Sequence, residues 1–141
     1  MNVTLRPGNA ADGQRCGEIC YDAFKAIAAQ HNFPPDFPSP EVPTGLLAHP
    51  GFYSVVAEIE CKIVGSNFLD ELSTIAGLGP ITVDPCLQNR AIGRQLMQVA
   101  LDRVKERSFP GVRLPQSAYH SRSLSLYARL GFVAREPVST M

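Results

Sequence analysis

Two segments with strand-like sequence, residues 78–83 and 112–116, each contain a proline, Pro80 and Pro115. Proline has no main-chain N–H to donate to a β-ladder, so it is tolerated at sheet edges and bulges but not between two fully paired strands. The two segments can therefore be neighbours in one sheet only if they diverge along part of their length. Such a divergence would leave a crevice within the sheet.

The other predicted elements place these two segments in a sheet of mixed direction. Residues 52–58 and 62–69 are rich in β-branched and aromatic residues and flank a short turn, which predicts a β-hairpin. Later strands alternate with helical patterns. The predicted strands are residues 3–6, 52–58, 62–69, 78–83, 112–116 and 132–138, and the predicted helices are residues 10–30, 44–49, 92–107 and a segment that starts at Ser121 or Ser123. We expect an α+β fold with a mixed, mostly antiparallel central sheet flanked by helices, in one domain that spans residues 1–141.

Capping residues support the predicted helix ends. Asn9 can cap the first helix, with Asp12 at the third helical position, and Gly131 stands where a left-handed residue would end the last helix. The most regular helix is residues 92–107. Its apolar residues recur at helical spacing and are Ile92, Leu96, Met97, Ala100, Leu101 and Val104.

Composition excludes several classes of protein. The chain has 13 basic and 13 acidic residues, so its formal net charge is zero and nucleic acid is not an expected partner. No apolar run approaches the roughly 20 residues that cross a bilayer, so no membrane association is expected. Residues 1–6 do not resemble the start of a signal peptide, so we expect a cytoplasmic protein. Its four cysteines, Cys16, Cys20, Cys61 and Cys86, lack the spacing of zinc ligands, so no metal is expected.

The turn before the third long helical pattern carries the most chemical information. Residues 81–97 read ITVDPCLQNRAIGRQLM, which predicts a strand, a loop and then a helix. The first turn of a helix has unpaired main-chain N–H groups and a positive dipole end. Ala91 and Gly93 are small enough for a ligand to approach closely, and Arg90 and Arg94 add positive charge. The residues alone fit a phosphate or pyrophosphate site, and they also fit a plain strand–turn–helix with surface cations.

The same stretch resembles the acyl-CoA-binding motif of the GNAT superfamily of N-acetyltransferases, written Q/R-x-x-G-x-G/A. Gln88, Ala91 and Gly93 stand at its fixed positions, and the preceding V-D-P is also typical. YARLGF at residues 127–132 resembles the second signature of the family, and LRPGNAAD at residues 5–12 resembles its opening. The resemblance spans nearly the whole chain. It implies a GNAT-like fold with splayed central strands, and transfer of an acetyl group from acetyl-CoA to a primary amine in a ternary complex.

The resemblance also implies roles for individual residues. The cofactor loop would hold the diphosphate of acetyl-CoA through the main chain of Gln88, Asn89, Arg90, Ala91, Ile92, Gly93 and Arg94. The pantetheine would lie between the proline-bearing strands and pair with main-chain groups of Ile81 and Val83. Tyr127 would donate a hydrogen bond to the leaving thiolate, because a phenol of pKa about 10 is a weaker acid than a thiol of pKa about 8.5. The alternative for Tyr127 is a core residue that packs its helix on the sheet.

Three departures from the family pattern affect these expectations. Ala91 replaces the first glycine, which would strain the alanine if its backbone is left-handed and would suit it if the backbone is helical. His120 stands where many members have an asparagine, seven residues before the tyrosine. The family usually adds one more strand after residues 132–138, and an unpaired edge there would favour a homodimer.

The acceptor side of the expected site is less well defined. Residues 31–43 contain five prolines, which predict an ordered loop in a region that usually shapes the acceptor pocket of the resembled family. The candidate substrate-binding residues are His31, Phe33, Asp36, Phe37 and Asp70. His31 suits a general base or a cation at a helix end, and Asp70 suits a base or a solvated turn. The aromatic residues suit amine binding or anchoring of the loop.

Two other functions fit the same motifs. The chain could be a non-catalytic acyl-CoA-binding or sensing module, which the lack of a clear base and the presence of His120 favour. It could also be an interaction domain whose scaffold no longer binds a ligand.

Overall fold

The computed structural model of the protein describes residues 2–34, 39–117 and 119–138. Its elements follow in the order β1 (Thr4–Pro7), η1 (Ala10–Asp12), α1 (Gly13–Gln30), α2 (Val42–Ala48), β2 (Phe52–Ile59), β3 (Lys62–Asp70), β4 (Ala76–Leu78), β5 (Thr82–Val83), η2 (Pro85–Leu87), α3 (Ile92–Glu106), β6 (Val112–Arg113) and α4 (Ser121–Arg129), where η is a short 3-10 helix.

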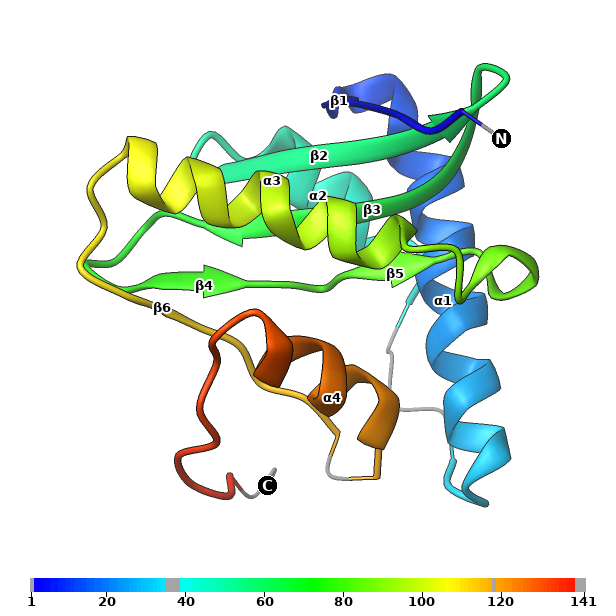
Figure 1. Cartoon of the computed structure of the whole chain (residues 1–141). Coiled ribbons are helices and arrows are strands. Elements are labelled where there is room, and N and C mark those ends of the chain that lie inside the picture. The colour runs from blue at the N-terminus through cyan, green and yellow to red at the C-terminus, as the bar shows by residue number, and fades with distance from the viewer. Residues whose placement is uncertain (1, 35–38, 118, 139–141) are drawn as a thin grey trace.

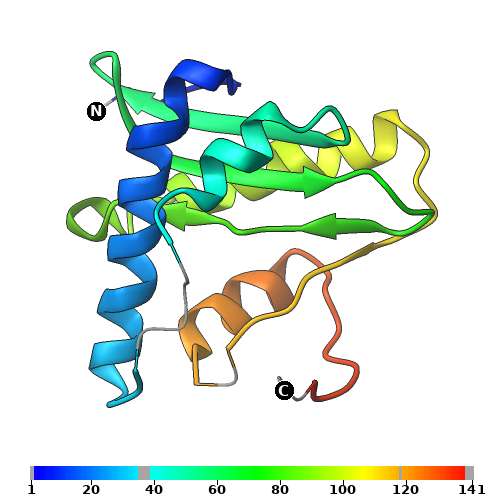
Figure 2. The ribbon, with the colours of Figure 1, turned by 180° about the vertical axis from the view of Figure 1, so that it is seen from behind.

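The described strands form one mixed sheet. Its strand order is β1-β2-β3-β4-β6, and β5 also pairs with β3. Each pair is antiparallel except β4 with β6, which is parallel. Helix α3 covers one face of the sheet and α1 and α2 cover the other, while α4 lies next to the chain that leaves β6 (Figures 1 and 2). This arrangement confirms the predicted α+β fold with a mostly antiparallel central sheet flanked by helices.

The ends and faces of the helices follow from their sequences. Asn9 and Asp12 form a reciprocal capping box at η1, which continues directly into α1. The buried face of α3 contains most of the predicted apolar stripe, namely Ile92, Leu96, Met97, Ala100 and Val104. Burying this stripe against the sheet holds the N-terminus of α3 at a fixed place beside β5.

The predicted strand at residues 78–83 is interrupted, which corrects the sequence-based expectation. Its first part pairs Leu78 with Leu69, and its second part pairs Thr82 with Ser66. The three residues between Leu78 and Thr82 therefore lie opposite only two residues of β3. Pro80 lies within this irregular stretch, where no ladder hydrogen bond is required of it. The interruption separates β4 from β5, which runs on along β3 and leads into the loop that precedes α3.

The two proline-bearing segments diverge as the sequence predicts. β6 is shorter than the predicted strand, since only Val112 and Arg113 pair with β4 and Pro115 lies beyond the pairing. Among the described residues β5 pairs with β3 alone. The side of β5 that faces away from β3 is therefore open to a ligand.

The last predicted strand is absent, which is a second correction. Residues 132–138 form no strand in the part of the chain that the structure describes. Val133 and Val138 are 75% and 82% exposed, so the segment does not alternate between a buried and an exposed face as a packed strand does. Pro137 also removes one of the donors that a ladder would need.

Two further findings concern residues 2–34, 39–117 and 119–138. No helix there combines the length and the apolar character needed to cross a membrane. Nor do these residues bring together three or more histidine, cysteine, aspartate or glutamate side chains that could hold a metal ion.

Candidate functional site

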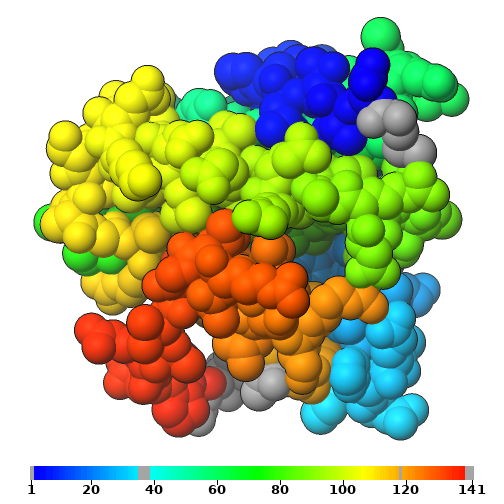
Figure 3. All heavy atoms as spheres, in the orientation of Figure 1, coloured from blue at the N-terminus to red at the C-terminus, as the bar shows by residue number. Residues whose placement is uncertain are grey.

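A pocket of about 710 Å³ occupies the place where the sheet diverges. β5 and the first turn of α3 form one wall, and α4 with residues 114–117 forms the facing wall. The C-terminal half of α1 closes the back of the pocket. In the space-filling view the surface is hollowed between α4 and the start of α3, with α1 visible behind (Figure 3).

The loop at the mouth of this pocket has two non-glycine residues with left-handed backbone. Asn89 has φ 69°, and Ala91 has φ 60° and ψ 13°. Ala91 is the residue immediately before α3, so the chain turns sharply there and begins the helix at the next residue. The position that holds glycine in the motif thus has a conformation that favours glycine, and the alanine here is strained rather than relaxed.

The first turn of α3 keeps unpaired donors. Within the described part of the chain, no protein acceptor is found for the main-chain N–H groups of Ile92 and Gly93. Both residues line the pocket. Together with the positive end of the helix dipole, these donors form a site suited to an anion.

Gly93 has room beside it on the pocket side. A Cβ atom at this position would lie 3.9 Å from Val83 Cγ2 and 4.0 Å from Leu126 Cδ2, which is ordinary contact. A methyl group would fit there, whereas a large side chain would extend into the space between β5 and α4. Gly93 therefore keeps the pocket open where the two walls approach each other.

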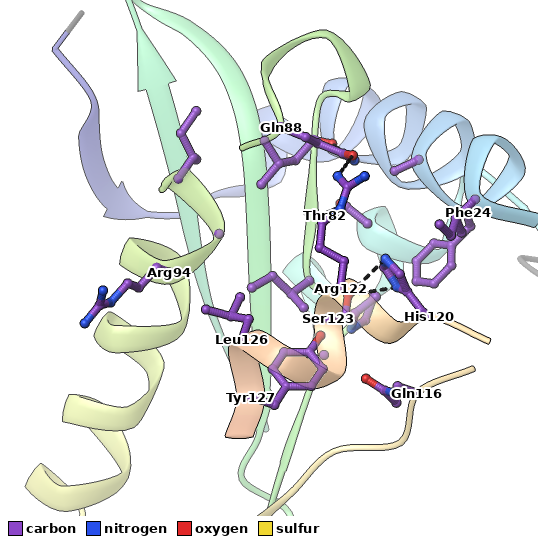
Figure 4. Close-up of a pocket in the computed structure, with 18 of the residues that line it drawn as sticks. Phe24, Thr82, Gln88, Arg94, Gln116, His120, Arg122, Ser123, Leu126 and Tyr127 are labelled. Atoms are coloured by element: carbon purple, nitrogen blue, oxygen red, sulfur yellow. Dashed lines mark hydrogen bonds between the residues drawn. The ribbon is translucent and has the colours of Figure 1, made fainter. Parts of the chain in front are cut away.

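The main chain of Val83 is directed toward the pocket. The N–H of Asp84 donates to the carbonyl of Val64 across the β3–β5 ladder, so in an antiparallel pair the preceding residue, Val83, turns its main-chain groups away from β3. The Val83 carbonyl accepts a hydrogen bond from the Gln88 side chain at 3.3 Å. Arg122 of α4 in turn donates to Gln88 Oε1 at 3.3 Å, so the two walls are linked at the pocket mouth (Figure 4).

Tyr127 lies at the inner end of the pocket and is 8% exposed. Burial raises the pKa of its phenol, and a hydrogen bond with Ser123 opposes that change. The phenol therefore remains protonated near neutral pH, and it is a better hydrogen-bond donor than proton donor. The Tyr127 ring also contacts Phe132 and belongs to the hydrophobic core. Tyr127 therefore packs α4 on the sheet and also lines the pocket.

His120, which stands where many members of the resembled family have an asparagine, is half-buried in the wall of the pocket. Ser123 Oγ lies 2.8 Å from its Nδ1 and 3.1 Å from its Nε2. Burial lowers the pKa of the imidazole, and the positive charges of Arg122 and His31 lower it further. The ring is therefore neutral at neutral pH and can accept a proton.

Gln116 contributes a buried acceptor to the same pocket. Its Oε1 atom is inaccessible to solvent and has no hydrogen-bond partner among the described residues. The residue follows β6 and the side chain lies across from His120 and Tyr127 (Figure 4). Because an unpaired buried carbonyl is costly, this atom is suited to a donor supplied by a ligand.

The structure brings most of the predicted cofactor residues together. Among the pocket-lining residues are the predicted cofactor residues Ile81, Val83, Gln88, Asn89, Ala91, Ile92, Gly93 and Arg94, and the predicted catalytic residue Tyr127. Arg90 belongs to the same loop but does not line the pocket, and the Arg94 side chain points away from it (Figure 4).

The predicted acceptor residues are not gathered in the same way. Phe33 stacks on Tyr119 with ring centroids 4.8 Å apart, and His31 contacts the same ring at 4.9 Å, outside the pocket lining. Asp70 also lies outside it and accepts a hydrogen bond from the main chain of Leu72. Asp36 and Phe37 lie outside the described residues.

Sequence reasoning missed several residues of the pocket wall. Gln116, His120, Arg122 and Ser123 line it. The signal for Ser123 was present, because it lies four residues before Tyr127 on a helix and such residues share a face. Gln116 had no such signal, because its position depends on how β6 ends.

The comparisons with known proteins agree with this geometry. The profile described as the acetyltransferase (GNAT) family matches residues 19–132. The chain therefore belongs to the GNAT acetyltransferase family. No curated protein sequence matches it.

Several solved structures share the fold at low sequence identity. The PaiA N-acetyltransferase from Thermoplasma acidophilum, in complex with coenzyme A, is 17% identical with a TM-score of 0.85, over 98% of this chain and 94% of that chain. A ribosomal-protein-alanine N-acetyltransferase from Brucella melitensis biovar Abortus 2308 is 15% identical with a TM-score of 0.77, over 100% and 99%. An aminoglycoside acetyltransferase from an uncultured soil metagenomic sample, in complex with trehalose, is 24% identical with a TM-score of 0.69, over 99% and 93%.

Proposed function

We propose that the protein is an N-acetyltransferase that transfers an acetyl group from acetyl-CoA to a primary amine by direct transfer in a ternary complex. The observation that carries this proposal is the continuity of the pocket, which runs from the unpaired N–H groups at the start of α3 to the buried phenol of Tyr127. Membership of the GNAT family supports it.

The residues present fit acetyl-CoA as the donor. The unpaired N–H groups of Ile92 and Gly93 suit its diphosphate, and the space beside Gly93 leaves room for the chain that follows. The outward-facing main chain of Val83 suits the amide groups of pantetheine. Gln88 and Arg122 border the same route and would have to exchange their present hydrogen bond for contacts with the ligand.

Acetyl-CoA would supply an activated thioester, and the protein would contribute position and polarity. The pocket would hold both reactants together, which would remove much of the orientational entropy from the barrier. Tyr127 donates a hydrogen bond to the negative charge that develops on the leaving sulfur. The raised pKa of the phenol favours this donor role over full proton transfer.

Release of the coenzyme A thiol tests the proposal directly. The purified protein is mixed with acetyl-CoA and a panel of primary amines, and free thiol is measured with a colorimetric disulfide reagent. Amine-dependent thiol release supports the proposal. Stabilisation of the protein by acetyl-CoA without release by any amine indicates a binding module, and no stabilisation at millimolar acetyl-CoA indicates an interaction domain.

A further inference from the structure

The inner part of the pocket contains a buried acceptor that no protein donor satisfies. Gln116 Oε1 has no solvent access and no hydrogen-bond partner in the described part of the chain. Buried acceptors in native proteins are nearly always paired, so an orphan acceptor on a residue that lines a pocket points to a donor on a ligand, which the atom meets once the side chain turns into the pocket. The primary amine of an acetyl acceptor is such a donor.

The neutral imidazole of His120 borders the same space. Figure 4 shows Gln116, His120 and Tyr127 around the inner pocket, with Ser123 in contact with the histidine. The charged and titratable groups that act on the imidazole are Arg122 on α4 and His31 at the end of α1. Both are basic, so they favour its neutral form, which is the form that accepts a proton.

The charged residues that line the pocket indicate which class of amine could accept the acetyl group. The described lining residues include no aspartate or glutamate, and their fully charged members are Arg122 and Arg129, together with Arg94, whose side chain points away from the pocket. The wall that α1 presents to the inner pocket is largely apolar and includes Phe24 and Ile27. A polycation would be repelled there, whereas an amine on an apolar or aromatic body would be favoured.

We propose that Gln116 and His120 form the acceptor-amine site, in which Gln116 Oε1 accepts a hydrogen bond from the amine and His120 takes its proton, and that the acceptor is a monoamine with an apolar or aromatic body. This proposal rests on the proposed acetyltransferase function.

The proposed step balances in atoms and in charge. The amine binds in its neutral form, and its nitrogen lone pair forms the C–N bond with the acyl carbon. The nitrogen becomes positively charged and acidic, and His120 removes its proton. The C–S bond breaks with its electron pair on sulfur, beside the phenol of Tyr127. The imidazolium releases its proton to solvent and the thiolate takes one proton from solvent, so the products are the amide and the free thiol.

The Gln116 side of the proposal is tested with Gln116→Leu. Loss of one hydrogen bond to the amine raises the KM for the amine about 10-fold, while the Kd for acetyl-CoA stays within 2-fold. The matched control is Gln98→Leu, at an exposed position of α3 where the side chain bonds to Asp102. An unchanged amine KM in a folded Gln116→Leu protein overturns the assignment of Gln116.

The His120 side is tested with His120→Gln. Removal of the base lowers kcat about 100-fold and abolishes the fall in kcat that the parent protein shows in acid, at a pH below the ordinary imidazole pKa because the pKa of His120 is lowered. His49→Gln is the matched control, since His49 lies outside the pocket lining. A His120→Gln protein that keeps both its kcat and its acidic limb overturns the assignment of His120.

The acceptor class is tested with tyramine and 2-phenylethylamine against spermidine and kanamycin. The parent protein is expected to show a kcat/KM at least 10-fold higher for the two monoamines, and Gln116→Glu is expected to narrow this ratio by adding a carboxylate. Turnover of the polycations alone overturns this inference but leaves the proposed function intact. Turnover of no amine overturns both.

Discussion

The strain at Ala91 leads to a prediction about stability. Ala91 has a left-handed backbone, an exposed side chain and no side-chain capping hydrogen bond, so its methyl group contributes little to packing. A left-handed conformation costs an alanine about 1–2 kcal/mol, whereas glycine adopts it freely. Glycine loses about 0.5–1 kcal/mol more backbone entropy on folding. Ala91→Gly should therefore raise the free energy of unfolding by about 0.5–1 kcal/mol.

Urea denaturation at neutral pH without ligand measures this change, and the same variant should unfold roughly 2–4 °C higher on heating. The matched control is Ala29→Gly, because Ala29 is an exposed alanine with helical backbone in α1. That change should lower the free energy of unfolding by about 0.5–1 kcal/mol. Opposite signs at the two positions support the reasoning. A loss of stability in both variants would show that Ala91 is not strained.

Three further predictions concern the pocket and one ion pair. Gly93→Trp should raise the Kd for acetyl-CoA more than 100-fold while the protein stays folded, because the indole would fill the space beside β5; calorimetric titration and circular dichroism check the two parts. Tyr127→Phe should lower kcat about 100-fold and leave the Kd for acetyl-CoA nearly unchanged, as steady-state kinetics and titration can show; equal loss in both would indicate a packing role. The Glu71 side chain bonds to Arg103, which holds the pKa of the carboxyl below its ordinary value of 4.5. Its contribution to stability is therefore complete above pH 4.5 and is lost as pH falls further, so Glu71→Gln should flatten the acid limb of the unfolding free energy against pH.

The parts of the fold that follow from local rules could be predicted from the sequence. The apolar spacing of α3 and the capping box at Asn9 locate two helices within a residue or two of their observed ends. The prolines predict the divergence of the sheet, because a proline has no main-chain N–H and so prevents full pairing between two neighbouring strands. Residues 132–138 show the limit of this reasoning, since their β-branched residues favour a strand that no buried partner stabilises.

The candidate site also has one part that could be predicted from the sequence and one part that could not. The cofactor loop is contiguous in sequence, so residues 88–94 could be recognised as a unit. The proposed acceptor side combines the C-terminal half of α1 with residues 116–123, which are distant from α1 in sequence. Gln116 and His120 are only four residues apart, but their place opposite α1 depends on tertiary packing, and neither residue type is distinctive without that context.

Amide chemical shifts test the central claim most directly, because they report on the N–H groups that are proposed to hold the diphosphate. On titration with coenzyme A, the amide proton resonances of Ile92 and Gly93 should move downfield and be among the most affected in the protein. ADP should reproduce these shifts, because it contains the diphosphate, and pantetheine alone should not. Saturable binding of coenzyme A that leaves both resonances in place would contradict the account.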